Sequence, residues 1–188
     1  MEVVRQIVEN APQNDVRTLT LYAFSSDNWQ RPETEVSALM KLFQLYLKKE
    51  VKKCIENGVR LSVVGRRDRF SPRLCEAIEQ AEAASSDCTR LHLRIAADYS
   101  ARDQILNAAR NYPADQEFTR ETFTACLSGD HLFGEPVADV DVLIRTGGEK
   151  RLSDFLLWEC AYAEMFFLDK MWPAFSADDL RSVIDSFK

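Results

Sequence analysis

The segment from residue 145 to residue 153 combines residue types that bind anions. It reads Arg-Thr-Gly-Gly-Glu-Lys-Arg-Leu-Ser, follows an apolar run and precedes a helix that we expect to begin at Phe155. Arg145 and Arg151 supply fixed positive charge, and guanidinium groups match the oxygens of phosphate. The two glycines predict a tight turn with exposed N–H groups, and Ser153 near a helix start is a further donor. The pattern fits a diphosphate clamp, and an ordinary strand-to-helix turn with solvated charges explains the same spacing about as well.

A second polar segment covers residues 25–32 and reads Ser-Ser-Asp-Asn-Trp-Gln-Arg-Pro. Taken alone, it favours an Asx-type turn in which an Asp or a Ser caps the helix that follows. An exposed Trp in so polar a loop is less usual, and Trp29 therefore indicates a lid or a platform for a substrate. The alternatives of a structural turn and a binding loop both remain open at this point.

Glu164 lies within the apolar stretch AYAEMFF. A carboxylate in such surroundings is either ion-paired or bound to a metal, and the ion pair is the more usual case. The chain contains neither G-x-x-x-x-G-K-[ST] nor G-x-G-x-x-G, so the phosphate-binding motifs of nucleotide proteins give no support for a nucleotide site.

Strands and helices are predicted to alternate along the chain. We expect strands at 18–24, 59–65, 91–97, 140–144 and 165–167, and helices at 2–10, 33–57, 72–84, 102–111, 119–127, from 155 and from 176. This alternation predicts an α/β fold with a mostly parallel central sheet flanked by helices. Ligands of such folds bind beyond the carboxyl ends of the strands, where both polar segments lie.

The predicted helix 33–57 carries more apolar residues than one contact face requires. Leu39, Leu42 and Phe43 are among them. Such a stripe is usually core, but it also suits the wall of a hydrophobic tunnel. A diphosphate clamp beside an apolar groove would suit an isoprenoid diphosphate.

Length and composition restrict the class of protein. The chain has 188 residues, a mass of 21.5 kDa and a formal net charge of −6, which suit a single soluble domain over 1–188 and argue against a general nucleic-acid coat. Its 5 cysteines are scattered without a C-x-x-C pair, which argues against a zinc site or a disulfide framework. No signal peptide or apolar run of about 20 residues is present, so we expect a cytoplasmic protein.

Two long runs closely resemble the cis-prenyltransferase family. They are TLTLYAFSSDNWQRPETEV at 18–36 and DVLIRTGGEKRLSDFLLWECAYAEMFFLDKMWPAF at 141–175. The segments RLSVVGRRDRF and LRIAADYSAR fit as well, so the resemblance covers essentially the whole chain. It implies condensation of isopentenyl diphosphate with an allylic diphosphate, with farnesyl diphosphate expected, in the presence of Mg2+. The expected product is a cis-polyprenyl diphosphate such as undecaprenyl diphosphate, the lipid carrier of cell-wall synthesis.

The resemblance also assigns roles to individual residues. Arg145, Arg151 and Ser153 resemble the clamp for isopentenyl diphosphate, and Glu164 resembles the acidic residue associated with magnesium. The mobile-loop residues implicated in catalysis and proton removal correspond to Ser25, Asn28 and Arg31, with Trp29 folding over the substrate and Leu39, Leu42 and Phe43 in the tunnel wall. The family further implies a homodimer, with 155–162 and the C-terminal segment near the interface, and peripheral membrane contact through the lipid product.

The sequence also departs from the family pattern. A DGNGRWA-type loop after a first strand, which binds the allylic diphosphate, and an RRFG-like tail do not occur in 1–188. We therefore expect a longer enzyme, exposed edges on the strands beside the first strand, and little turnover from 1–188 alone. The alternative is a non-catalytic accessory or diphosphate-binding subunit. The family's N-Y-G-G-R turn reads Asp98-Tyr99-Ser100-Ala101-Arg102, which predicts a different backbone there.

Overall fold

The computed structural model describes residues 2–128 and 138–187, which form two compact units. Unit 1 comprises Met1–Asn10 and Ser100–Lys188, and unit 2 comprises Ala11–Tyr99. The chain passes from one unit to the other between Asn10 and Ala11 and again between Tyr99 and Ser100. That both units belong to one domain remains a prediction.

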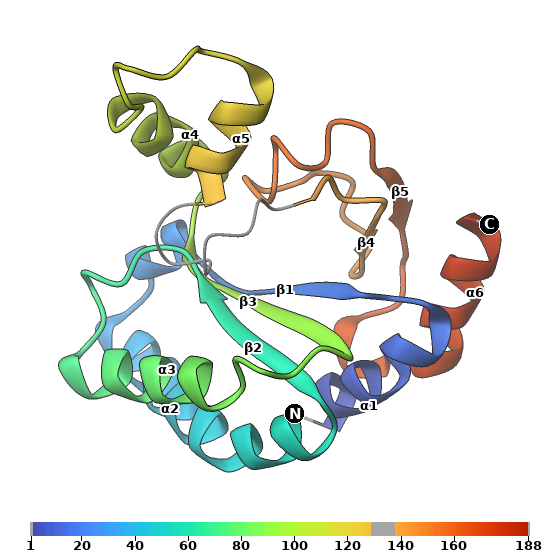
Figure 1. Ribbon diagram of the computed structural model, residues 1–188. Coiled ribbons are helices and arrows are strands. Elements are labelled where there is room, and N and C mark those ends of the chain that lie inside the picture. The colour runs from blue at the N-terminus through green and yellow to red at the C-terminus, as the bar shows by residue number, and fades with distance from the viewer. Residues whose placement is uncertain (1, 129–137, 188) are drawn as a thin grey trace. The chain divides into compact units, whose positions relative to one another are not determined.

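Unit 2 is a parallel three-stranded sheet with helices packed against it (Figure 1). Its strand order is β1-β3-β2, and α2 contacts α3 while both helices contact β2. The elements are η1 Ala11–Asn14, β1 Thr18–Ser25, η2 Ser26–Gln30, α2 Glu33–Glu56, β2 Val59–Val64, α3 Pro72–Ala84 and β3 Leu91–Tyr99.

The strands of unit 2 differ in burial as their places in the sheet require. β3 is central, and all of its residues except His92 are buried. β1 is an edge strand in the described part of the chain, and most of its residues are partly exposed. Gly65 follows β2 with φ +121°, and a Cβ at this position would lie 2.2 Å from the carbonyl oxygen of Ala97. Only glycine therefore allows the backbone after β2 to approach the end of β3.

Unit 1 contains the remaining elements and a two-stranded parallel sheet. These elements are α1 Glu2–Asn10, α4 Ala101–Arg110, α5 Arg120–Ser128, β4 Val142–Arg145, β5 Glu164–Phe167, η3 Trp172–Ala174 and α6 Ala177–Phe187. The strands β4 and β5 pair in register from Val142 opposite Glu164. The helices α4 and α5 enclose an apolar cluster of Ala108, Phe123 and Leu127, against which Trp158 packs.

Every predicted strand is present, and every strand pairing in the described residues is parallel, which confirms the α/β fold. The helix predicted from Phe155 is wrong. Residues 153–162 form turns instead, and Ser153, Asp154 and Leu156 have φ values of 52°, 60° and 45°. An α-helix requires negative φ at each residue, so this backbone cannot begin one there.

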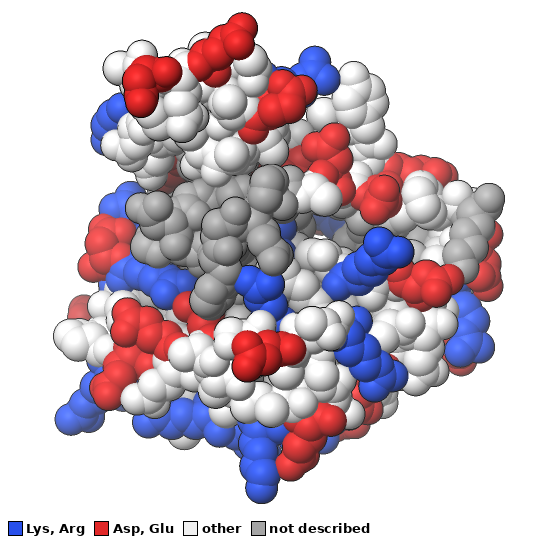
Figure 2. Space-filling view, viewed as in Figure 1, with Lys and Arg blue, Asp and Glu red and all other residues white. Residues whose placement is uncertain are grey.

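None of the described helices combines the length and apolarity needed to cross a membrane. On the face shown in Figure 2, acidic and basic side chains are interspersed.

Candidate functional site

The structure brings Arg145, Arg151 and Ser153 together in unit 1. Arg145 is the last residue of β4, and its Nη1 donates a hydrogen bond to the Ser153 hydroxyl at 3.0 Å. The same nitrogen donates to the backbone carbonyl of Arg151. Residues eight positions apart therefore share one surface, here called the clamp.

The glycines of the clamp do not offer free amides, which corrects the sequence prediction. Gly147 and Gly148 have φ values of 91° and 74°, as a tight turn requires. Their N–H groups donate to the carbonyls of Lys170 and Leu168, at 3.0 and 2.9 Å. Ser153 also does not begin a helix. Anion binding at the clamp therefore depends on the guanidinium groups and the hydroxyl.

Glu149 is a clamp residue that sequence reasoning missed. Its carboxylate forms an ion pair with Nη1 of Arg151, and the side chains of Arg151 and Glu149 are 62% and 50% exposed. An ion pair this exposed is weak, so an incoming anion can compete for the guanidinium. The sequence Glu149-Lys150-Arg151 shows that charged residues lie here, but it does not show that Glu149 pairs with Arg151.

Asp154 ties the clamp to the start of α4. Its carboxylate accepts a hydrogen bond from the Ser100 hydroxyl at 2.5 Å and another from the Arg102 N–H at 3.1 Å. Its backbone carbonyl accepts from the Ala101 N–H at 3.0 Å. Because Asp154 follows Ser153 directly, these bonds restrain the clamp hydroxyl. The sequence gives no sign of these contacts, because Asp154 lies more than 50 residues after Ser100 and Arg102.

Glu164 is exposed at the start of β5, and its N–H donates to the carbonyl of Asp141 at 2.9 Å. Among the described residues, no group of three or more potential metal ligands occurs. Magnesium is commonly held by one or two carboxylates together with substrate phosphates. The accessible carboxylate of Glu164, in the unit that carries the clamp, fits that mode of binding.

The loop Ser25–Arg31 in unit 2 is organised by its own polar groups. The Ser25 N–H donates to Oδ1 of Asn28 at 2.9 Å, and the Arg31 N–H donates to the Asn28 carbonyl at 3.2 Å. The guanidinium of Arg31 pairs with Glu35 at 2.7 Å on the surface. Asn28 thus fixes the turn, and Arg31 stays accessible.

Trp29 is partly buried, whereas the sequence predicts an exposed side chain. Its ring packs edge-on against Phe24, with centroids 5.5 Å apart, and tilted against Phe70 at 6.5 Å. The guanidinium carbon of Arg69 lies 5.0 Å from the ring centroid. The indole N–H is buried and has no hydrogen-bond partner among the described residues.

The helix α2 exposes several of its apolar side chains. Leu39 is 36% exposed, Leu42 is 50% exposed and Phe43 is partly buried. Leu45 on the same helix is 65% exposed. The face that packs on the unit instead includes Val36, Leu47 and Cys54. The clamp and Glu164 belong to unit 1, whereas the loop and α2 belong to unit 2.

Comparison with known families and proteins supplies independent evidence. A family model described as "Putative undecaprenyl diphosphate synthase" matches residues 1–188. Isoprenyl transferase 1 of Bradyrhizobium diazoefficiens is 54% identical over 187 residues, covering 100% of this chain and 74% of the relative. A ditrans,polycis-undecaprenyl-diphosphate synthase ((2E,6E)-farnesyl-diphosphate specific) of Pseudomonas aeruginosa is 43% identical, covering 100% of this chain and 76% of the relative.

Two solved structures share the fold. A probable undecaprenyl diphosphate synthase from Campylobacter jejuni superposes with a TM-score of 0.88 at 32% identity, covering 99% of this chain and 86% of the other. Lavandulyl diphosphate synthase from Lavandula x intermedia, in complex with dimethylallyl diphosphate, gives a TM-score of 0.87 at 29% identity, with 99% and 82% covered.

Proposed function

Because this chain belongs to the cis-prenyltransferase family, we propose that it condenses isopentenyl diphosphate with an allylic diphosphate, farnesyl diphosphate in the first round, to give a cis-polyprenyl diphosphate. The names of the relatives support this reaction, and undecaprenyl diphosphate is the product that several of those names specify. The observation that carries the proposal is the clamp, in which Arg145 bonds to Ser153 and to the backbone of Arg151.

The clamp suits the diphosphate group of isopentenyl diphosphate. Two guanidinium groups present several N–H donors to the oxygens, and the Ser153 hydroxyl adds one more. The exposed Glu149–Arg151 pair can open at small cost when an anion arrives. Binding through a non-reacting group orients the double bond at the far end of the substrate, and such positioning supplies much of an enzyme's rate enhancement.

The reaction is balanced as follows. The allylic C–O bond breaks and diphosphate leaves with the bonding electrons. The terminal alkene carbon of isopentenyl diphosphate forms the new C–C bond to the allylic carbon, which leaves a positive charge on the internal alkene carbon. The CH2 group next to that carbon then loses a proton to the released diphosphate, and a new double bond forms. We assign the environment of this proton transfer to Ser25, Asn28 and Arg31. Magnesium supplies charge neutralisation of the diphosphate when bound, and Glu164 is the residue that we assign to hold it.

The growing chain requires an apolar surface. Such a surface is present on α2 at Leu39, Leu42 and Phe43. The large apolar side chains of Leu39 and Leu42 are exposed there. We assign them to the wall that receives the polyprenyl product, and Trp29 to the cover over the substrate. We place the enzyme in the cytoplasm, with peripheral membrane contact through its lipid product.

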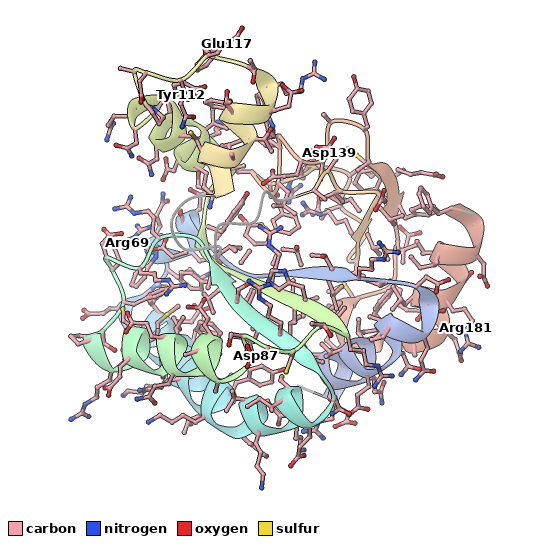
Figure 3. The ribbon with its side chains drawn as sticks, in the orientation of Figure 1. Arg69, Asp87, Tyr112, Glu117, Asp139 and Arg181 are labelled. Atoms are coloured by element: carbon pink, nitrogen blue, oxygen red, sulfur yellow. The ribbon has the colours of Figure 1, made fainter. Side chains whose placement is uncertain are left out.

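Binding is tested on residues 1–188, and turnover is tested on the protein as purified from its native gene. Isothermal titration with isopentenyl diphosphate reports the clamp, and extraction of labelled polyprenyl product after incubation with farnesyl diphosphate and Mg2+ reports catalysis. The proposal predicts saturable binding that Arg151→Ala weakens, and a labelled product that requires Mg2+. The exposed Arg181 on α6, labelled in Figure 3, gives the control Arg181→Ala. Binding without product would favour the accessory subunit, and neither binding nor product would refute both functions.

A further inference from the structure

Asp98 is a buried carboxylate that the proposed reaction does not use. It lies on β3 with 0% exposure and has φ 52°, in the left-handed region that Asp and Asn tolerate better than most residues. A charge taken out of water requires specific partners, because an uncompensated buried carboxylate is strongly destabilising. The partners of Asp98 therefore indicate what it is placed to hold.

Those partners come from two segments of unit 2. Arg69, labelled in Figure 3 on the segment between β2 and α3, donates from Nε to Oδ2 of Asp98 at 2.8 Å and from Nη2 to Oδ1. The Ser26 hydroxyl donates to Oδ1 at 3.2 Å. Asp98 thus connects the Arg69 segment with the first residue of η2, inside the loop Ser25–Arg31.

Arg69 also contacts the loop Ser25–Arg31 directly. Its guanidinium lies over the Trp29 ring, 5.0 Å from guanidinium carbon to ring centroid, while both of its forked contacts go to Asp98. A planar guanidinium can stack and fork at once, which an ammonium cannot do. The loop is therefore held at Ser26 by the carboxylate and at Trp29 by its counterion.

The Arg69 segment is itself rigidly anchored. Arg67 Nη2 donates to the buried Glu82 carboxylate at 2.7 Å and to the Val63 carbonyl at 3.0 Å, and Glu82 also accepts the Val63 N–H at 2.8 Å. The Arg66 N–H donates to the Asp98 carbonyl at 3.0 Å. The pair Arg69–Asp98 is thus fixed to the sheet on both sides, and the loop depends on it.

We propose that Asp98 and Arg69 are positioning residues that set the conformation of the loop Ser25–Arg31 through the Ser26 hydroxyl and the Trp29 ring. Both act through other residues and neither touches the reacting atoms. This inference rests on the proposed function in one respect, because the loop matters to catalysis only if the chain is a prenyltransferase. The physical restraint of the loop stands independently of the reaction.

The chain supplies a matched control within the same segment. Arg66 forks onto Asp68, with Nε to Oδ1 at 3.0 Å and Nη2 to Oδ2 at 2.7 Å, and these two side chains are 44% and 61% exposed. The test variants are Asp98→Asn and Arg69→Lys, and their controls are Asp68→Asn and Arg66→Lys. Each control makes the same chemical change in an exposed pair.

The first readout is 19F NMR of the full chain labelled with 5-fluorotryptophan. The 3 tryptophans give three resonances, and Trp29→Phe assigns one of them. Asp98→Asn and Arg69→Lys are expected to shift or broaden the Trp29 resonance and leave those of Trp158 and Trp172 unchanged, while both controls leave all three unchanged. If Asp98→Asn fails to fold, Arg69→Lys decides, because it keeps a cation beside the buried carboxylate. An unmoved Trp29 resonance in Arg69→Lys, or an equal change in all three resonances, overturns the proposal.

The second readout is steady-state kinetics. Misplacing a catalytic loop lowers kcat, whereas the clamp that binds isopentenyl diphosphate is elsewhere in the chain. Arg69→Lys is expected to lower kcat by about tenfold with KM for isopentenyl diphosphate changed by less than about twofold. An unchanged kcat in an active enzyme contradicts the catalytic role of the loop restraint. If the wild-type protein as purified from its native gene makes no product, the proposed function fails, and the Trp29 resonance still decides whether the pair holds the loop.

Discussion

At the scale of single residues, Arg145 is the centre of the clamp. Its Nη1 serves both Ser153 and the Arg151 carbonyl, so its geometry matters as much as its charge. Arg145→Lys keeps the positive charge but replaces the planar guanidinium with an ammonium group. Hydrogen bonds to charged groups contribute about 1.5–3 kcal/mol, so we expect affinity for isopentenyl diphosphate to fall about tenfold or more, measured by isothermal titration.

Arg181→Lys is the control for this prediction, because Arg181 is exposed on α6 and has no role in the clamp. It should leave the affinity unchanged. Equal affinity of Arg145→Lys and the wild type would show that the clamp recognises charge alone, and the geometric argument would then be wrong.

The residues of the clamp could be singled out from the sequence, but their hydrogen-bond partners could not. Arginines flanking a Gly-Gly turn after an apolar strand fit an anion site and an ordinary turn about equally well, and only the family resemblance favours the anion site. The amides of Gly147 and Gly148 were expected to be exposed, yet they are occupied by carbonyls of Leu168 and Lys170, about 20 residues further along the chain. Asp98 was recognised only as a departure from a family turn, because its partners Ser26 and Arg69 come from other segments. Local sequence encodes donors, while tertiary packing decides which of them remain available.

At the scale of elements, hydrogen bonds connect the start of α4 with the clamp. Ser100 is the N-cap of α4, accepting the Asp103 N–H at 3.1 Å, and its hydroxyl donates to Asp154 at 2.5 Å. We predict that Ser100→Ala lowers the free energy of unfolding by about 1 kcal/mol through the lost cap. It should also weaken binding of isopentenyl diphosphate, because Asp154 loses the contact that restrains Ser153. Urea unfolding and isothermal titration measure the two effects.

Ser71→Ala separates the cap from the clamp. Ser71 is the N-cap of α3 in unit 2, where its hydroxyl accepts the Leu74 N–H at 3.3 Å. This control should lose stability of similar size and keep the wild-type affinity. If both variants bind isopentenyl diphosphate equally well, Ser100 caps its helix without influencing the clamp.

The start of α6 predicts a dependence of stability on pH. Asp179 accepts hydrogen bonds from the Lys170 ammonium and from the hydroxyl and N–H of Ser176, and these lower its pKa from 3.8 to about 2. A carboxyl whose folded pKa lies below its unfolded pKa stabilises the fold above the unfolded value. This contribution is therefore complete above pH 4 and lost as the pH falls toward 2.

Acid unfolding followed by circular dichroism measures this effect. Asp179→Asn should reduce stability at pH 7 and make the acid unfolding less steep between pH 4 and pH 2, whereas the neighbouring Asp178→Asn should not. Identical acid transitions in Asp179→Asn and the wild type would contradict the assigned linkage. The helix expected from 176 agrees with α6, because the residues that form its start are contiguous in the sequence.

Elements whose determining residues are contiguous in the sequence were also the ones that could be predicted. Helices such as Pro72–Ala84 follow from a local Ser-Pro start and an apolar period, and they agree with the structure. The helix expected from Phe155 failed because Ser153, Asp154 and Leu156 adopt positive φ. Asp154 is held in that geometry by Ser100 and Arg102, and these bonds cannot be inferred from the apolar pattern of the segment itself.

At the scale of the whole molecule, the homodimer that the family resemblance implies stays a prediction, and exposed apolar side chains suggest where its interface would lie. Tyr162 is 82% exposed and Met171 is 63% exposed, and Met165, Trp172 and Phe187 are also exposed in the same stretch of unit 1. Single exposed apolar side chains are normal, whereas several of them on one surface mark an interaction site, so we predict that these neighbours in the sequence share one. The family resemblance implies a homodimer with 155–162 and the C-terminal segment near the interface, and the exposed side chains at 162–187 are candidates for that surface.

Sedimentation velocity tests this surface. The wild-type chain is expected to sediment at twice its monomer mass of 21.5 kDa, and Tyr162→Lys with Met171→Lys at the monomer mass, because two charges in an apolar interface remain desolvated and unpaired. Leu106→Lys is the matched control, since Leu106 is 62% exposed on α4, outside this stretch. A monomeric wild type at micromolar concentration would refute the homodimer. A dimer that persists in the double variant would place the interface elsewhere on the molecule, and the exposed side chains at 162–187 would then need another partner.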